Sequence, residues 1–216
     1  MKINLNSLMK PKANPPPKEL VAPFTAEAEQ IFKRCGMIET ELTKKVAPLF
    51  GRILFDIGDS SLSIWSGGKP EIADTGYATQ TKGMLLAGGV GIGKSMILRC
   101  VAATIHAEYL TVPDLSTLFS QQGSDGFWNA VGRANRWDLM LDDLGAEKAV
   151  KSYSNALPIE ELLYRRYDLW QRHGVRTHIA TNLVGDQVEE RYGMRIRDRL
   201  KEMMTPVVSN GKSLRK

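Results

Sequence analysis

Apolar residues follow a helical spacing in the first part of this chain. Between residues 25 and about 65 they recur every three or four positions, as they do in helices that bury one face. The positions that carry this spacing are Ile31, Cys35, Ile38, Leu42, Val46, Leu49, Phe50, Ile53 and Leu54. We therefore expect two or three helices, which the turn-forming run SGGKP at 66–70 ends before a boundary near residue 75.

After residue 75 the pattern changes to short apolar runs that alternate with helical stretches. The expected strands are 84–87, 109–112, 139–141, 177–180 and, more weakly, 206–208. The clearest expected helices are 95–106, 159–173 and 188–204, the last with a break at Gly193. Alternating strands and helices are typical of a parallel sheet. We therefore expect an α/β domain with five parallel strands over residues 75–216, preceded by a small helical region over residues 25–74.

The first 24 residues differ from both of these parts. Prolines cluster there, including the run at 15–17, and apolar periodicity is weak. Because such a composition does not support a packed element, we expect a disordered arm rich in proline and lysine over residues 1–24. A short docking peptide is the alternative.

Composition and charge narrow the class of protein. The 216 residues are 43% hydrophobic and 25% charged, and no apolar run reaches the length of a membrane span, so we expect a cytoplasmic protein without a membrane partner. The net charge is +5, but residues 1–24 contribute +3 and residues 191–216 contribute +6, which leaves −4 for the residues between them. This distribution argues against a uniformly basic protein that coats nucleic acid. The two cysteines, Cys35 and Cys100, are far apart in the sequence and suggest neither a disulfide framework nor a zinc site.

A phosphate-binding motif lies between the first expected strand and the helix after it. Residues 88–95 read GGVGIGKS, which matches G-x-x-x-x-G-K-(S/T) at every position. Glycines let backbone N–H groups turn inward, Lys94 reaches the β and γ phosphates, and the Ser95 hydroxyl ligates magnesium. A glycine-rich turn with a chance lysine is the alternative. With ATP and Mg2+ as cofactors, the residues expected to bind the nucleotide are Gly88, Gly89, Val90, Gly91, Ile92, Gly93, Lys94, Ser95 and Met96.

Polar residues end the two expected strands that follow. Asp142 is expected to hold the magnesium, directly or through water, and Asp143 to polarise the attacking water. Adjacent acids that cap the next loop are the alternative. Because Asp is one methylene shorter than Glu, slow ATP hydrolysis is expected. Asn182 ends the next strand at the same edge of the sheet, where a γ-phosphate contact and an ordinary turn asparagine are both open.

The chain resembles the AAA+ ATPases of the helicase-loader family, the DnaC and DnaI type, and their IstB-type relatives among transposon helpers. The segments that carry the resemblance are, in order, LLAGGVGIGKS, LMLDDLGAEK, HIATNL, ERYGMRIRDRL and GKSLR. They span about residues 75–216. The resemblance implies an AAA+ P-loop core without a C-terminal helical lid, and it does not reach the first 75 residues.

The resemblance also implies roles for single residues. It makes Asn182 the sensor of the γ phosphate and Arg199 the arginine finger that reaches into a neighbouring subunit's site. Arg195, four residues earlier on the same expected helix, is a second candidate for the finger. Arg215 lies where such proteins have a second phosphate-sensing arginine. A solvated basic helix and tail are the alternative for all three arginines.

The function implied by the resemblance is helicase loading in DNA replication. The implied partners are a replicative ring helicase, single-stranded DNA, and further copies of this chain across an ATP-bridged interface. A transposition helper ATPase of the IstB type is one alternative. A P-loop small-molecule kinase is another, although no lid insertion for an acceptor is visible in the sequence. The helices of residues 25–74 either grip the helicase or complete the ATPase core.

Residues that flank the third expected strand are candidates for single-stranded DNA contacts, which combine basic and aromatic side chains. They are Phe127, Trp128, Arg133, Arg136, Lys148 and Lys151, of which the two aromatic residues fit core packing better. His178 lies within an expected central strand and is interpreted as a core histidine.

Overall fold

The computed structural model describes residues 18–64, 82–135, 137–147, 158–183 and 185–215. Five strands form one sheet: β1 (Gly83–Gly88), β2 (Glu108–Thr111), β3 (Leu139–Leu144), β4 (Thr177–Thr181) and β5 (Met204–Ser209). Their order across the sheet is β2-β3-β4-β1-β5, and every described pair is parallel. The expectation of a five-stranded parallel sheet is confirmed, and each expected strand is present, although Val112, expected to end the second strand, begins the next helix instead.

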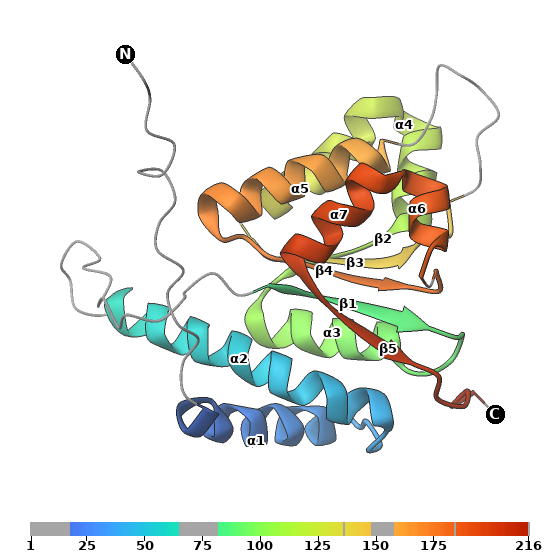
Figure 1. Cartoon of the computed structure of the whole chain (residues 1–216). Coiled ribbons are helices and arrows are strands. Elements are labelled where there is room, and N and C mark those ends of the chain that lie inside the picture. The colour runs from blue at the N-terminus through green and yellow to red at the C-terminus, as the bar shows by residue number, and fades with distance from the viewer. Residues whose placement is uncertain (1–17, 65–81, 136, 148–157, 184, 216) are drawn as a thin grey trace, which may run out of the picture.

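Helices cover both faces of the sheet (Figure 1). On one face lie α1 (Lys18–Arg34), α2 (Glu41–Ile64) and α3 (Lys94–Ile105), and on the other lie α4 (Val112–Gly132), α5 (Ile159–His173), α6 (Gln187–Tyr192) and α7 (Met194–Met203). Between α4 and β3 runs a short 3-10 helix, Arg133–Asn135. Gly193, with φ of 83°, separates α6 from α7, so the break expected there is confirmed.

The strand alternation divides the core into two layers. Met84 and Leu86 of β1 and Met140 of β3 face the first layer, with α1, α2 and α3. Leu139 and Leu141 of β3 face the second layer, with α4 to α7. Because successive side chains of a strand point to opposite faces, one buried strand supplies both layers.

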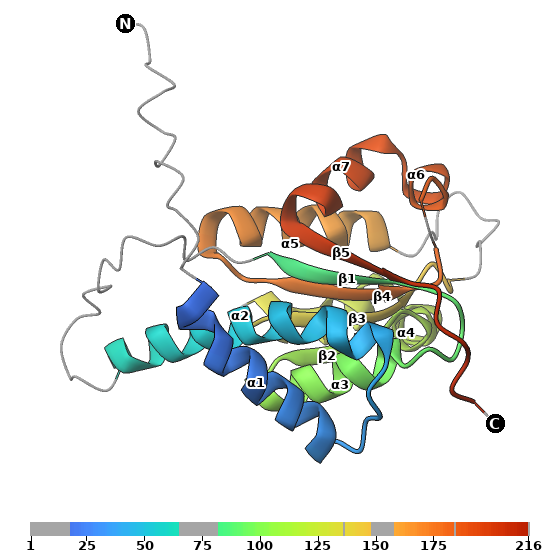
Figure 2. The same ribbon diagram turned by 60° about the horizontal axis from the view of Figure 1, so that its bottom comes forward.

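The N-terminal helices complete the first core layer. They form an antiparallel pair that lies against α3 (Figure 2), and the rings of Phe32 and Phe50 stack with centroids 5.6 Å apart. Thr40 and Thr43 exchange hydrogen bonds at the start of α2, from Thr40 N to Thr43 Oγ1 (2.8 Å) and from Thr43 N to Thr40 Oγ1 (3.1 Å). This reciprocal cap fixes where α2 begins.

The expected end of the N-terminal arm at residue 24 is wrong. Helix α1 begins at Lys18 and contains Pro23, so residues 18–24 are helical. Pro23 is in the second turn of α1, where it removes one helical N–H donor, and the packing of α1 on α2 outweighs that cost. Residues 1–17 of the expected arm, the turn at 66–70 and the boundary near residue 75 lie outside the described residues.

Candidate nucleotide-binding site

The phosphate-binding motif forms the turn between β1 and α3, as expected. Gly88, Gly91 and Gly93 all have positive φ, of 144°, 82° and 97°. A Cβ on Gly88 would lie 2.1 Å from the carbonyl oxygen of Ser209 on the neighbouring strand, so only glycine fits there. Gly93 caps α3 without a side-chain hydrogen bond, which leaves the first N–H groups of the helix for an anion.

Lys94 is held firmly at the start of α3. Its side chain is buried, with 7% of the residue exposed. Its Nζ donates to the carbonyl oxygens of Gly88 (2.8 Å) and Gly89 (2.7 Å) and to Oδ1 of Asn182 (2.9 Å). Burial lowers the pKa of Lys94, the charge of Arg215 lowers it further, and Asp143 and Asp142 act in the opposite direction. The structure therefore joins Lys94 and Asn182, which are far apart in sequence, at one point.

The other residues of the motif differ in exposure. The side chain of Ile92 is buried in the first core layer, so only its backbone can contact a ligand. Val90 and Met96 are 60% and 49% exposed beside the loop. Ser95 is half-buried in the first turn of α3, the position from which a hydroxyl can ligate a metal held at the loop.

Asp142 and Asp143 lie at the carboxyl end of β3. Asp142 is buried, and its Oδ1 accepts from the Asp143 N–H at 2.9 Å. The register of β3 on β4 shifts between Leu141 and Leu144, and Asp143 has φ of 56°. This irregularity turns Asp143 away from the regular strand alternation. Burial, and next the neighbouring Asp142 charge, raise the pKa of Asp143.

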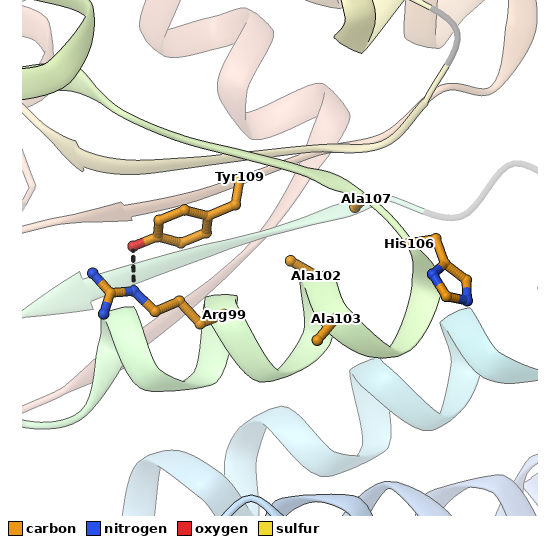
Figure 3. Close-up of a pocket in the computed structure, with 6 residues that line it drawn as sticks. All are labelled: Arg99, Ala102, Ala103, His106, Ala107 and Tyr109. Atoms are coloured by element: carbon orange, nitrogen blue, oxygen red, sulfur yellow. Dashed lines mark hydrogen bonds between the residues drawn. The ribbon is translucent and has the colours of Figure 1, made fainter.

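A tyrosine that the sequence did not single out contacts Asp142. The Tyr109 hydroxyl of β2 donates to Asp142 Oδ2 at 2.5 Å, and Arg99 Nε of α3 donates to the Tyr109 hydroxyl at 3.1 Å (Figure 3). Burial, followed by the hydrogen bond to Asp142, raises the pKa of Tyr109 to about 12. Strand periodicity alone could place Tyr109 on one face of its strand, but its meeting with Asp142 depends on the strand order.

The predicted arginines lie in two places. Arg199 of α7 stacks over the rings of Tyr164 and Tyr167 of α5, at 4.2 Å and 5.1 Å from their centroids. Arg195 is exposed on the same helix. These contacts place Arg199 on the face of the sheet opposite α3, against the aromatic side of α5. A role for either arginine in a neighbouring subunit's site stays a prediction.

The C-terminal tail lies against the phosphate loop. The Leu214 N–H donates to the carbonyl oxygen of Gly91 at 2.9 Å. A Cβ on Gly91 would lie 2.3 Å from Ser213 Oγ and 3.3 Å from Arg215 Cγ. Arg215 is therefore beside the loop, where its charge acts on Lys94 and Asp143.

The donor set fits a nucleotide with magnesium. A glycine turn with the helix start provides N–H donors, and Lys94 provides the cation. Ser95 and Asp142 provide the oxygen ligands that magnesium prefers. Asp143 and Asn182 are close enough to this set to share its electrostatics or hydrogen bonds.

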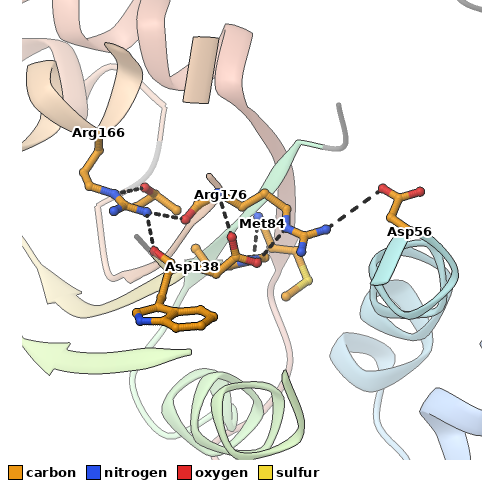
Figure 4. Close-up of polar contacts among 8 residues, drawn as sticks. Asp56, Met84, Asp138, Arg166 and Arg176 are labelled. Atoms are coloured by element: carbon orange, nitrogen blue, oxygen red, sulfur yellow. Dashed lines mark hydrogen bonds and ion pairs between the residues drawn. The ribbon is translucent and has the colours of Figure 1, made fainter. Parts of the chain in front are cut away.

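A second polar cluster lies at the opposite, amino edge of the sheet (Figure 4). Arg176 donates from Nε to Asp138 Oδ2 at 2.7 Å and lies 4.0 Å from Asp56 Oδ2 of α2. His178 is fully buried, as expected, and its Nδ1 accepts from the Met84 N–H at 3.2 Å. Nε2 of His178 has no hydrogen-bond partner within the described residues, and Asp138 Oδ2 is 4.0 Å away.

Arg166 is buried completely in the same cluster. Its guanidinium donates to Thr177 Oγ1 (2.7 Å) and to the carbonyl oxygens of Trp137 (3.2 Å), Arg176 (2.5 Å) and Ala134. Burial lowers the pKa of Arg166 to about 10, while the Asp138 charge opposes that shift. These bonds tie the segments before β3 and β4 together.

Most of the side chains that are candidates for DNA contacts lie outside the described residues. Phe127 is buried and packs edge-on against Trp128, with centroids 4.9 Å apart, so the packing interpretation of Phe127 is confirmed. Arg165 stacks over the Trp128 ring at 3.9 Å. Arg136, Lys148, Lys151 and the side chain of Arg133 lie outside the described residues. Within the described residues, the helices are too short or too polar to cross a membrane.

Solved structures of other proteins resemble this chain in structure, although their sequence identity to it is low. No family model matches the chain. The solved structure of a DnaC helicase loader aligns with a TM-score of 0.50 and 18% identity, and the alignment covers 80% of this chain and 92% of that one. A DNA replication initiation factor aligns with a TM-score of 0.53 and 14% identity, over 81% of this chain and 48% of the other.

One curated protein is similar in sequence over a shorter stretch. A shikimate kinase of Thioalkalivibrio sulfidiphilus is 35% identical over 81 residues, which is 33% of this chain and 40% of the enzyme. The match therefore spans less than half of either protein. The parallel sheet, the phosphate loop and the two structural likenesses together show that the chain has a P-loop NTPase fold, shared with the DnaC helicase loader and the replication initiation factor.

Proposed function

We propose that this chain is an ATP-dependent DNA replication protein that acts as a helicase loader. The observation that carries the proposal is the meeting of Lys94, Asn182 and the Asp142–Asp143 pair at the carboxyl edge of the parallel sheet. The structural alignment supports it, because it spans 92% of the DnaC helicase loader. A chain of this kind binds ATP, assembles side by side, and delivers a ring helicase to single-stranded DNA.

Nucleotide binding uses the phosphate loop. Lys94 and the first N–H groups of α3 hold the β and γ phosphates, and Ser95 and Asp142 are the residues that would hold magnesium. Bound magnesium neutralises phosphate charge and makes the γ phosphorus easier to attack. Asn182 accepts a hydrogen bond from Lys94, which supports its proposed role as the sensor of the γ phosphate.

Asp143 activates the attacking water in this proposal. Its carboxylate is only partly buried and lies next to the buried Asp142, so water can reach it. The raised pKa of Asp143 makes it a better proton acceptor than an exposed aspartate. Because the side chain is one methylene shorter than glutamate, hydrolysis is slow.

Assembly controls hydrolysis in this proposal. An arginine of α7, either Arg199 or Arg195, enters the neighbouring subunit's site and neutralises charge on the transferred phosphoryl group. The stack of Arg199 on Tyr164 and Tyr167 orients its guanidinium before a neighbour arrives. Arg215, which lies beside the phosphate loop of its own chain, senses the phosphates from within the same subunit.

The N-terminal helices offer a surface for the helicase. Leu20 of α1 and Ile38 before α2 are 46% and 63% exposed, although other apolar residues of these helices fill the core. Exposed apolar patches mark sites where proteins bind one another, and these two residues are the candidates for such a patch on the N-terminal helices. We place the helicase grip there, together with residues 1–17.

The proposal is tested by capturing partners from a lysate of the source organism, with and without ATP. Wild type should recover a ring helicase in ATP, and Lys94→Ala should not. Leu20→Glu, Ile38→Glu and a chain lacking residues 1–17 test the grip. These variants leave α1 and α2 in the core, whereas deletion of both helices would expose it.

Two other functions have their own expected outcomes. Recovery of a transposase instead of a helicase would favour an IstB-type helper. The shikimate kinase likeness favours a P-loop kinase, because that enzyme transfers a phosphoryl group to a small molecule. Transfer of the γ phosphate of radiolabelled ATP to a small acceptor such as shikimate, rather than release as phosphate, would establish the kinase and reject the loader.

A further inference from the structure

Tyr109 and Arg99 form a hydrogen-bonded chain that ends on Asp142. In the parallel pairing of β2 with β3, Thr111 lies opposite Asp142, and Tyr109 is two residues before Thr111. Residues two apart on a strand point to the same face, so Tyr109 and Asp142 both face α3. Arg99 comes from α3 itself, about one turn after the phosphate loop ends at Ser95 (about 3.6 residues per turn).

The contacts account for both oxygens of the Asp142 carboxylate. Oδ1 accepts from the Asp143 N–H at 2.9 Å, and Oδ2 accepts from the Tyr109 hydroxyl at 2.5 Å. Each carboxylate oxygen has two lone pairs, so one on each oxygen stays available for a metal. The two donors come from different strands and together fix the plane of the carboxylate.

The tyrosine is itself held from the outside. Arg99 Nε donates to the Tyr109 hydroxyl oxygen at 3.1 Å, and the Arg99 guanidinium lies 5.2 Å from the ring centroid. A hydroxyl that accepts a hydrogen bond from a cation becomes a stronger donor. Both side chains line an open pocket between α3 and β2, together with His106 (Figure 3), so the far end of the chain of bonds faces solvent.

We propose that Tyr109 is a positioning residue that orients Asp142 for magnesium, and that Arg99 holds Tyr109 in that role. This inference rests on the proposed function, because it adds two residues outside the phosphate-binding motif to the proposed ATP site. A carboxylate that ligates a metal binds it more tightly when hydrogen bonds fix its orientation. Loss of such a partner typically weakens metal affinity or activity about 10- to 100-fold.

The test measures nucleotide affinity in the presence and absence of magnesium. Tyr109→Phe removes the hydroxyl and keeps the ring. We expect the Kd of a fluorescent ATP analogue in Mg2+ to rise about tenfold, with a matching rise in the Mg2+ concentration needed for half-maximal binding. The Kd in EDTA should be unchanged, because phosphate contacts of the loop do not involve Tyr109. Arg99→Gln should produce the same pattern at about threefold, since it removes only the outer hydrogen bond.

Controls separate this inference from a general loss of structure and from the proposed function. Thr104→Val removes another hydroxyl of α3, one that donates to Cys100 O at 2.8 Å. This variant should bind the ATP analogue as wild type does, both with and without Mg2+. Equal affinity of wild type and Tyr109→Phe in Mg2+ would overturn the inference. So would a loss of the same size in Mg2+ and in EDTA. Failure of wild type to bind ATP, or wild-type binding by Lys94→Ala, would instead overturn the proposed function.

Discussion

The two ends of strand β3 carry aspartates in opposite electrostatic situations. Burial works to raise the pKa of Asp138 at the amino end, but the hydrogen bonds and the charge of neighbouring Arg176 act against it, and the pKa is lowered to about 2. At the carboxyl end, burial and the adjacent Asp142 raise the pKa of Asp143. The same residue type is thus stabilised as an anion at one edge of the sheet and destabilised as an anion at the other.

This difference shows that polar groups have different surroundings at the two edges of the sheet. At the amino edge, buried charges meet opposite charges and carbonyl oxygens, an arrangement that holds segments together. At the carboxyl edge, Lys94 is hydrogen-bonded to carbonyl and amide oxygens, and the nearby carboxylates Asp142 and Asp143 are adjacent groups of like charge. Titratable groups whose pKa is shifted by burial or by a neighbour of like charge are typical of functional sites. The amino edge should therefore govern stability and the carboxyl edge activity.

The largest effect is expected at the amino edge, from Arg166→Met. The substitution removes the buried guanidinium and takes one donor from each of the acceptors on Ala134, Trp137, Arg176 and Thr177. The free energy of unfolding should fall by about 3–5 kcal/mol, measured by urea denaturation. Arg172→Met, on the exposed side of the same helix, should change it by less than about 0.5 kcal/mol. A loss below about 1 kcal/mol in Arg166→Met would show that this cluster does not control stability.

The next effect is expected at the carboxyl edge, from Lys94→Ala. Removal of the cation should reduce the rate of phosphate release from ATP about 10²- to 10³-fold, because the proposal assigns Lys94 to the β and γ phosphates. Its effect on the free energy of unfolding should stay below that of Arg166→Met. Lys82→Ala, which removes an exposed lysine that donates to Lys201 O, serves as the control and should hydrolyse ATP normally. Normal hydrolysis by Lys94→Ala would contradict the assignment of this edge to activity.

Asp143→Asn should separate binding from hydrolysis. Asparagine tolerates the positive φ of 56° at this position, so the backbone should be preserved. The amide cannot accept the proton of water, and hydrolysis should fall about 10²-fold while the Kd of ATP stays within about threefold. Measurements of phosphate release and of nucleotide affinity on the same samples check both halves. Retained hydrolysis would remove Asp143 from its proposed role.

The smallest effect is a pH dependence of stability that arises at the amino edge. Burial lowers the pKa of His178 below its ordinary value of 6.5, so the folded chain holds the neutral imidazole. The unfolded chain binds the proton more readily, and stability should therefore fall as the pH drops below 6.5, by up to about 1.4 kcal/mol per pH unit. Asp138 adds a loss only at lower pH, between its ordinary value of 3.8 and about 2.

Unfolding curves between pH 7.5 and 5 (about two units across the window) check this prediction. In His178→Gln the slope below pH 6.5 should shrink, because the variant has no imidazole to protonate. Parallel curves for the two proteins would mean that other groups set the acid limit of stability.

Much of the fold was accessible from local patterns. The helix expected at 159–173 coincides with α5, and Gly174 follows it with φ of 68°, since a glycine ends a helix by adopting a conformation that other residues avoid. The phosphate loop was also accessible, because its glycines, Lys94 and Ser95 are consecutive. The arm boundary was missed because Pro23 suggested an irregular segment, whereas the apolar face of α1 packs on α2 and overrides it.

Other parts depended on contacts between distant segments. Cys35 and Cys100 are remote in sequence, yet α1 packs near α3, and burial together with the Cys35 thiol raises the pKa of Cys100 to about 12. Similarly, the C-terminal tail reaches the phosphate loop through the Leu214–Gly91 hydrogen bond. No local spacing contains the information for such meetings.

The sequence by itself determined the succession of strands and helices along the chain, the phosphate loop, and the residues that end β3 and β4. These features depend on side-chain periodicity and on the backbone freedom of glycine, which act over a few neighbouring residues. Only the tertiary structure decided that Lys94 meets Asn182, that Tyr109 holds Asp142, and that α1 and α2 complete the core. Those outcomes depend on which strands lie side by side, and burial of the whole apolar surface selects that order rather than any single segment.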